Sequence, residues 1–91
     1  MSLSEAEIIQ LIKKYVSEHY RVGENELNNN INLFEAGIID SMGVFDLATF
    51  LEQSFEVKLE EEHFFDSRSR SIQGMAAIVK EIKDSEEQES N

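Results

Sequence analysis

Residues 41–55 read SMGVFDLATFLEQSF and carry the clearest helical pattern in the chain. Apolar side chains recur at every third or fourth position of this stretch, namely at Val44, Leu47, Ala48, Leu51 and Phe55, with Phe50 beside them. Such a stripe is typical of a helix that packs one face against a core. The stretch therefore predicts a helix, and a different face of that helix carries Met42, Phe45 and Thr49.

Two other stretches show the same periodicity. Ser4 and Glu7 form a capping-box signature, and they open a helix expected over residues 4–20 with apolar positions at Ile8, Leu11, Ile12, Tyr15 and Val16. Ser71 is placed to cap a last helix, whose apolar positions are Ile72, Met75, Ala76, Val79 and Ile82. We expect the core of the bundle to include Ile12, Leu47, Phe50, Leu51 and Val79.

The segments between these helices are less regular. Residues 21–40 contain two glycines and three consecutive asparagines, yet they also carry apolar side chains that can anchor a long loop to the core. Residues 60–66 have room for one short helix anchored by Phe64 and Phe65, and residues 67–70 form a polar connector. The expected fold is all-α, a small bundle of three main helices plus one short helix, with a long loop between the first two.

The composition fits one small domain. The chain has 91 residues and no Cys, Pro or Trp, which excludes disulfides, thiolate nucleophiles and cysteine metal sites. A chain of this length forms one core, so its stability has to come from apolar packing. We expect a single domain over residues 1–83 and an acidic disordered tail over residues 84–91, which contain no apolar residue.

The charge of the chain is strongly negative. Its 8 Lys and Arg against 19 Asp and Glu give a net charge of −11, and the cations are scattered, which argues against nucleic acid binding. An acidic protein is instead steered toward basic patches on other proteins. The sequence has no apolar run long enough to span a membrane and no signal-peptide pattern at its start. We therefore expect a cytoplasmic protein that is monomeric.

Few side chains offer catalytic or metal-binding chemistry. His19 and His63 lie on different predicted elements and have no partner at metal-ligand spacing. The asparagine-rich residues 24–32 lack the alternating ligands and the closing Glu of a calcium loop. No grouping of Ser, His and Asp suggests a catalytic triad. We therefore expect neither a bound metal ion nor an enzyme.

The junction between the long loop and the second helix has two interpretations. Residues 37–43 read GIIDSMG, which places Asp40 and Ser41 at the helix start. In the first interpretation one of these residues is simply an N-cap. In the second the Ser41 hydroxyl is a modification point, because a phosphate attached there lies beside unpaired amides and the positive end of the helix dipole. The position alone leaves both interpretations open.

The wider sequence resembles the acyl carrier protein family. Residues 33–43 read LFEAGIIDSMG, residues 51–55 read LEQSF, and the resemblance extends over residues 4–83. It implies that Ser41 carries 4′-phosphopantetheine, transferred from coenzyme A by a separate phosphopantetheinyl transferase. The thiol of this arm would hold an acyl or aminoacyl group as a thioester. The resemblance further implies that Asp40 assists the transferase by helping to position a magnesium ion, which is present only in that complex.

The resemblance also implies a docking face for partner enzymes. Met42 and Phe45, with Thr49 as a lesser member, would form an exposed apolar spot, surrounded by a negative rim of Glu35, Asp40, Asp46 and Glu52. Such a rim contributes more to encounter rate and discrimination than to affinity. The alternative from another class is an unmodified helical adaptor or regulatory module, in which Met42 and Phe45 bind a partner and Ser41 only caps the helix.

The details of the resemblance favour one kind of carrier. Fatty-acid carriers usually have a densely acidic second helix followed by a proline-containing segment, whereas residues 41–59 contain only three acids and the chain has no proline. Residues 35–43, including Gly43, are more similar to free-standing carriers of activated amino acids, such as D-alanyl carriers, and to carriers of specialised-metabolite pathways. The implied partners are an adenylating ligase or acyltransferase that loads the arm, and downstream enzymes that use the acyl group.

Overall fold

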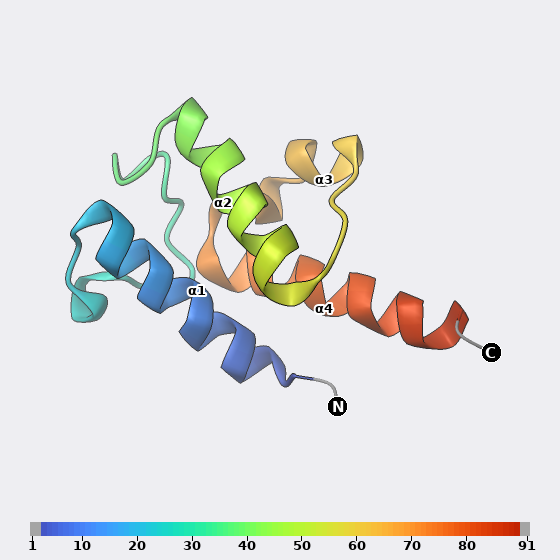
Figure 1. Cartoon of the computed structure of the whole chain (residues 1–91). Helices are drawn as coiled ribbons and strands as arrows, with labels where there is room; N and C mark the ends of the chain where they lie inside the picture. Colours follow the sequence, from blue (N-terminus) through green and yellow to red (C-terminus); the bar gives the residue numbers. More distant parts are fainter. Residues whose placement is uncertain (1–2, 90–91) are drawn as a thin grey trace.

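The computed structural model describes residues 3–89 of the chain. Its four α-helices are α1 (Glu5–Tyr20), α2 (Ser41–Phe55), α3 (Glu61–Phe65) and α4 (Ile72–Glu89), and two short 3₁₀ segments are η1 (Glu24–Glu26) and η2 (Ser67–Arg70). The part of the chain so described contains no strand. Helix α1 packs against α4, and α2 lies between α1 and α3 (Figure 1). The predicted all-α bundle of three main helices and one short helix is confirmed.

The helix starts follow from the capping residues that the sequence predicts. At the start of α1 the Ser4 side chain accepts a hydrogen bond from the Glu7 N–H at 3.2 Å, and the Glu7 carboxylate accepts one from the Ser4 N–H at 3.1 Å. At the start of α4 the Ser71 Oγ accepts a hydrogen bond from the Gly74 N–H at 2.9 Å. Each contact satisfies an amide of the first turn that has no partner within its own helix.

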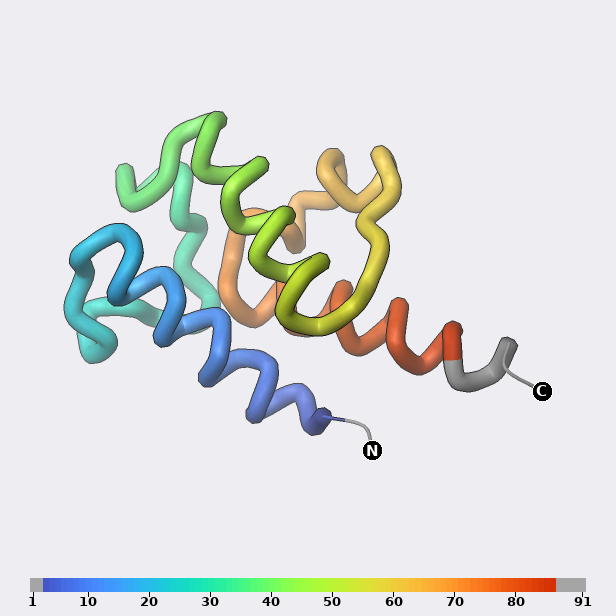
Figure 2. The backbone as a smooth tube through the Cα atoms, viewed as in Figure 1, coloured from blue at the N-terminus to red at the C-terminus, as the bar shows by residue number. Residues whose placement is uncertain are grey.

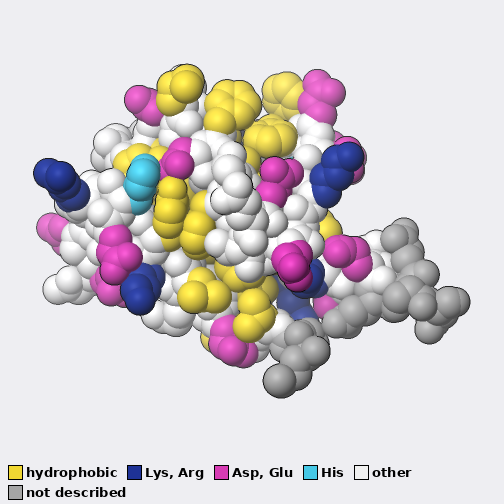
Figure 3. Space-filling model, viewed as in Figure 1, with side chains coloured by type: hydrophobic (Ala, Val, Ile, Leu, Met, Phe, Trp, Pro, Cys, Tyr) yellow, Lys and Arg dark blue, Asp and Glu magenta, His cyan; other side chains and the backbone are white. Residues whose placement is uncertain are grey.

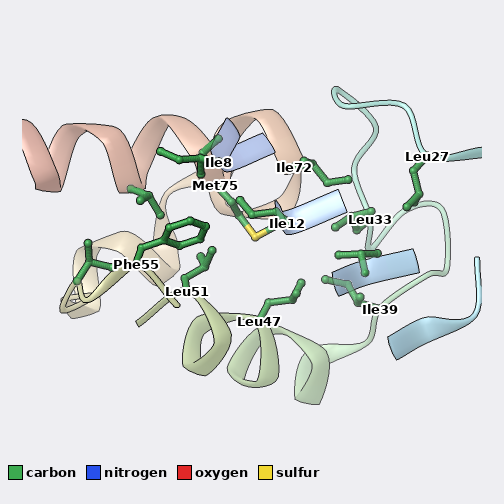
Figure 4. Close-up of a cluster of buried hydrophobic side chains, with 14 residues drawn as sticks. Ile8, Ile12, Leu27, Leu33, Ile39, Leu47, Leu51, Phe55, Ile72 and Met75 are labelled. Atoms are coloured by element: carbon green, nitrogen blue, oxygen red, sulfur yellow. The ribbon is translucent and has the colours of Figure 1, made fainter. Parts of the chain in front are cut away.

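The core lies where the apolar faces of the three long helices meet. Figure 4 shows Ile8 and Ile12 of α1, Leu47, Leu51 and Phe55 of α2, and Ile72 and Met75 of α4 pointing toward one another. Of the predicted core residues, Ile12, Leu47, Leu51 and Val79 are buried. Phe50 is only half-buried, because it lies at the edge of the core with its ring stacked on Tyr15 at 4.0 Å between centroids.

The long loop is held against this core at several points. Its side chains Leu27, Leu33 and Ile39 are buried. Its backbone is tied to the start of α4, since the Leu33 N–H donates to the Arg70 carbonyl at 2.8 Å and the Gln73 N–H donates to the Asn29 carbonyl at 2.9 Å. The tube in Figure 2 follows this loop past the start of α4 and on to the start of α2. The loop thereby fixes where α2 begins.

The connector η2 lies very close to α4. A Cβ atom added at Gly74 would be 1.9 Å from the Arg68 carbonyl oxygen, so only glycine fits at this position. The Arg68 guanidinium forms ion pairs with Asp66 and with Glu81 of α4. These contacts fix the end of α3 relative to α4.

Two expectations about the helices are wrong. Leu11 was expected on the buried stripe of α1, but 45% of it is exposed, because the buried stripe runs through Ile8, Ile12 and Val16 alone. The tail expected to be disordered from residue 84 begins instead as part of α4, which continues to Glu89. Glutamate and glutamine favour helix, and Lys80 pairs with Asp84 one turn on at 3.2 Å. Residues 90–91 of that tail lie outside the described residues.

Candidate functional site

Asp40 is the N-cap of α2. Its backbone is extended, and its Oδ1 accepts a hydrogen bond from the Gly43 N–H at 3.0 Å. Ser41 is therefore the first residue of the helix and has no capping task. Ser41 is exposed, and among the described residues its hydroxyl has no hydrogen-bond partner. Of the two interpretations of this junction, the structure assigns the cap to Asp40 and leaves the Ser41 hydroxyl accessible.

The residues around Ser41 are held from two sides. On the loop side, Ile39 is buried and its N–H donates to the Leu33 carbonyl at 3.3 Å. On the helix side, a Cβ atom at Gly43 would lie 2.9 Å from the Ile39 Cβ and 3.1 Å from the Tyr20 Oη. The missing side chain at Gly43 thus lets the loop and the end of α1 approach the first turn of α2, which positions Ser41.

Met42 and Phe45 lie on the outer face of α2. They are 72% and 61% exposed, which is unusual for such large apolar side chains. Thr49 is exposed on the same face, one turn after Phe45, and its Oγ1 donates to the Phe45 carbonyl at 3.0 Å. Neither Met42 nor Phe45 is needed to fill the core.

Helix α3 enlarges this apolar face, which the sequence did not indicate. Phe65 was expected to be an anchor but is 77% exposed, while Phe64 is half-buried with its ring 5.9 Å from that of Phe45. Because consecutive residues of a helix point in different directions, only one phenylalanine of the pair can face inward. In Figure 3 hydrophobic side chains gather along the edge formed by the start of α2 and by α3. We call Met42, Phe45 and Phe65 the outer apolar face.

The four acids expected to form a rim around this face have different surroundings. Glu35 and Asp40 are exposed. Glu52 accepts a hydrogen bond from the Leu59 N–H at 2.9 Å, so it holds the segment after α2. Asp46 is turned toward α1 and accepts hydrogen bonds from the Tyr15 Oη at 2.9 Å and the Tyr20 Oη at 2.8 Å. Asp46, expected as a member of the rim, is thus bound by two tyrosines of α1, while 35% of its side chain remains exposed.

The tyrosines that bind Asp46 have altered acidity. Burial, followed by the hydrogen bond to the Asp46 carboxylate, raises the pKa of Tyr15 to about 12. The same causes in the same order raise the pKa of Tyr20. His19 completes the cluster, with its Nε2 3.4 Å from the Asp46 Oδ2. This cluster joins α1 to α2 at Asp46, five residues after Ser41, and sequence periodicity gave no sign of it.

An apolar cavity lies behind the outer apolar face. Its volume is about 30 Å³, and it is lined by side chains of α2, α3 and α4 together with Leu59 and Ser69. Phe64 lines the cavity, and its ring is 5.9 Å from that of Phe45, so it connects the cavity lining to the outer apolar face. The polar lining consists of Ser69 and His63, and the His63 Nδ1 accepts a hydrogen bond from the Glu60 N–H at 2.8 Å.

The described residues contain no group of three or more His, Asp or Glu side chains that could hold a metal ion. Within the same part of the chain, none of the helices is both long and apolar enough to cross a membrane. His19 of α1 lies against Asp46 of α2, and His63 accepts its hydrogen bond from the Glu60 N–H next to its own helix.

Comparison with known proteins decides between the remaining interpretations. Residues 10–79 match the family described as phosphopantetheine attachment site. The chain belongs to this family of carrier proteins. It is also similar to the "Probable acyl carrier protein PigG" of Serratia sp. (strain ATCC 39006), with 31% identity over 75 residues that cover 81% of this chain and 86% of that protein.

Membership of the carrier family has three consequences for the predictions from sequence. The carrier bears a covalent 4′-phosphopantetheine arm, as predicted. It is a carrier of groups and not itself an enzyme. It works with a phosphopantetheinyl transferase and with biosynthetic enzymes that use the loaded arm. An unmodified adaptor is accordingly not favoured.

Proposed function

We propose that Ser41 is the residue to which the phosphopantetheine arm is attached. The single observation that carries this proposal is the division of tasks at the start of α2. Asp40 provides the cap, and Ser41 keeps an exposed hydroxyl that has no hydrogen-bond partner within residues 3–89. A phosphate on this oxygen lies beside the free amides of the first helical turn. When bound, the arm supplies a terminal thiol, which a chain without cysteine otherwise lacks.

Asp40 has a second task in this proposal. Its Oδ1 is used for the cap, whereas its Oδ2 has no hydrogen-bond partner among the described residues. A carboxylate oxygen is a preferred ligand of magnesium, which usually binds proteins through one or two carboxylates together with phosphate groups. Asp40 therefore helps to position the magnesium ion while the transferase moves the arm from coenzyme A to Ser41.

The outer apolar face is the docking site for the transferase and for the enzymes that load and use the arm. Met42, Phe45 and Phe65 supply exposed apolar area, with Thr49 beside them, and Glu35 and Asp40 supply negative charge near it. A partner with an apolar pocket and a basic rim complements this surface. The net charge of −11 steers such partners to the carrier. The loading enzyme in this proposal is an adenylating ligase or an acyltransferase.

The attachment site is tested with purified protein. The carrier is incubated with coenzyme A, magnesium and a broad-specificity phosphopantetheinyl transferase, and its intact mass is measured. The expected result is a mass gain of one phosphopantetheine group on the wild type and on Ser54→Ala, which removes another exposed serine of α2, and no gain on Ser41→Ala. A gain on Ser41→Ala, or none on the wild type, contradicts the proposal.

A further inference from the structure

The cavity behind the outer apolar face bears on what the carrier transports. Its lining includes Val44, which lies three residues after Ser41, so the cavity extends to the first turn of the helix that begins with Ser41. An acyl chain on the arm that entered the bundle between α2 and α4 would have to occupy this space. The size of the space therefore limits which acyl groups the bundle can enclose.

The cavity is too small for a chain of several carbon atoms. Its volume is about 30 Å³. A cavity needs about 10–15 Å³ to hold one water molecule, and an apolar cavity that binds benzene measures roughly 150 Å³. The space between α2 and α4 thus has about one fifth of the volume of that benzene-binding cavity.

The side chains around the cavity leave little room for enlargement. Leu47, Leu51 and Met75 line it and are each less than 5% exposed, as members of the main core. On the outer side Phe64 closes it and is supported by the ring of Phe45. Because cores are packed to the density of organic crystals, a longer chain enters only if several of these residues move. Met75 lines the cavity from α4, and its unbranched side chain is of the kind that fills irregular gaps in a core.

We propose that the folded bundle does not enclose the carried group, and that Met75 and Phe64 close the space in which a chain would lie. This inference rests on the proposed attachment at Ser41. A long apolar chain left outside the bundle would expose a large apolar surface to water, which is unfavourable. The cargo that suits such a carrier is a short or polar acyl group, such as an amino acid or a small carboxylic acid, joined to the arm as a thioester.

The test compares a short and a longer acyl group on the same protein. The transferase and either acetyl- or octanoyl-coenzyme A give the two acylated forms, and intact mass confirms that Ser41 is loaded. Hydroxylamine is then added, its nitrogen attacks the thioester carbonyl, and the arm leaves as the free thiol while the acyl group becomes a hydroxamate. Each rate constant is divided by that of the same acyl group on free pantetheine, which removes the intrinsic difference between the two thioesters.

For the wild type, we expect the same normalised rate for the acetyl and octanoyl forms and the same melting temperature. A chain enclosed for nine tenths of the time would react about tenfold more slowly, because only the exposed fraction reacts. It would also raise the melting temperature, since a group that binds the native state stabilises it. Slower release and a higher melting temperature for octanoyl wild type would overturn the inference. Absence of any mass gain would instead contradict attachment at Ser41, so the two failures are distinguishable.

A cavity-enlarging variant tests the assignment of Met75. In Met75→Ala we expect octanoyl release to become several-fold slower than acetyl release, because the removed side chain leaves space for the chain. The matched control is Val79→Ala, which removes buried atoms of α4 outside the cavity lining and should release both groups at equal normalised rates. Equal rates in a folded Met75→Ala protein would show that Met75 does not close the space. Far-UV circular dichroism verifies folding, and the wild-type comparison stands independently of both variants.

Discussion

Tyr20 at the end of α1 and Asp46 in α2 are joined by a hydrogen bond of 2.8 Å between the Tyr20 Oη and the Asp46 Oδ2. The same tyrosine oxygen lies next to Gly43, where a Cβ atom would be only 3.1 Å away. The contact therefore connects α1 to the turn of α2 that begins with Ser41. It also explains why Asp46, although it lies on the helix proposed to contact partners, is a structural residue.

Replacing Tyr20 by phenylalanine tests this contact. Hydrogen bonds to charged groups contribute about 1.5–3 kcal/mol, and because the Asp46 side chain is 35% exposed we expect Tyr20→Phe to lower the free energy of unfolding by about 1 kcal/mol. Urea denaturation gives the value. The double-mutant cycle with Asp46→Asn is the control, since the effect of Tyr20→Phe should shrink when the carboxylate is already absent. An equal loss in both backgrounds would assign the effect to something other than this hydrogen bond.

The tyrosine cluster also predicts a loss of stability at alkaline pH. The pKa of Tyr15 is raised from 10 to about 12, so the folded protein favours the protonated hydroxyl more strongly than the unfolded chain does. The contribution of this group to stability is complete below about pH 10, the unfolded value, and is lost as the pH rises from there toward 12. The urea concentration at the unfolding midpoint should stay constant between pH 8 and pH 10 and decrease between pH 10 and pH 12.

Ultraviolet titration reports the two tyrosines directly. The chain has two Tyr and no Trp, so tyrosinate absorbance comes only from Tyr15 and Tyr20. We expect both groups to titrate above pH 10 in the folded protein and near pH 10 in concentrated urea. Titration near pH 10 in both conditions would contradict the placement of the two hydroxyls against Asp46.

Gly74 provides a prediction about packing. Alanine usually stabilises the interior of a helix relative to glycine by up to about 1 kcal/mol. At Gly74 its Cβ atom would lie 1.9 Å from the Arg68 carbonyl oxygen, and relief requires a shift of the backbone of η2. We therefore expect Gly74→Ala to destabilise the protein by about 2 kcal/mol or more, as overpacked cores do.

Gly23→Ala is the matched control for that substitution. The nearest atoms to a Cβ atom at Gly23 are side-chain atoms at 3.4 Å, so a methyl group fits there. Urea denaturation of this variant should give a free energy of unfolding within about 0.5 kcal/mol of the wild type. A stable Gly74→Ala protein would show that η2 does not lie against α4 as described.

The outer apolar face predicts a separation of stability from partner recognition. Phe65 is 77% exposed, so Phe65→Ala should leave the melting temperature nearly unchanged. If partners dock on this face, the variant loses about 1–2 kcal/mol of binding free energy, which lowers kcat/KM of the transferase about 5–30-fold. Leu11→Ala removes another exposed apolar side chain, on α1, and should leave kcat/KM unchanged. A marked loss of thermal stability in Phe65→Ala would instead place this ring in the core.

Most of the fold could be predicted from the sequence because it rests on local signals. The periodicity of Leu47, Leu51 and Phe55 and the caps at Ser4 and Ser71 depend on residues within a few positions of one another, and helices form by such contacts. The solvent exposure of Leu11 and Phe65 could not be predicted in this way. Periodicity shows which side chains share a face, but in α1 and α3 it does not show how much of that face the neighbouring helices cover.

The candidate site was likewise predictable where it depends on local sequence and not where it depends on contacts between helices. The position of Asp40 and Ser41 at the start of α2 follows from the sequence alone. The hydrogen bonds that turn Asp46 away from the outer face come from tyrosines 26 and 31 residues earlier in the chain. A partner at that separation depends on how α1 and α2 cross, and no pattern within one helix contains that information.

The small cavity also affects how partner enzymes recognise the carrier. If the carried group stays outside the bundle, as we propose, the bundle has the same shape and the same surface before and after loading. An enzyme that docks on Met42, Phe45 and Phe65 then receives no signal from the bundle about the group on the arm. In that case each enzyme would have to identify the group in its own active site, and the enzymes rather than the carrier would set the order of reactions.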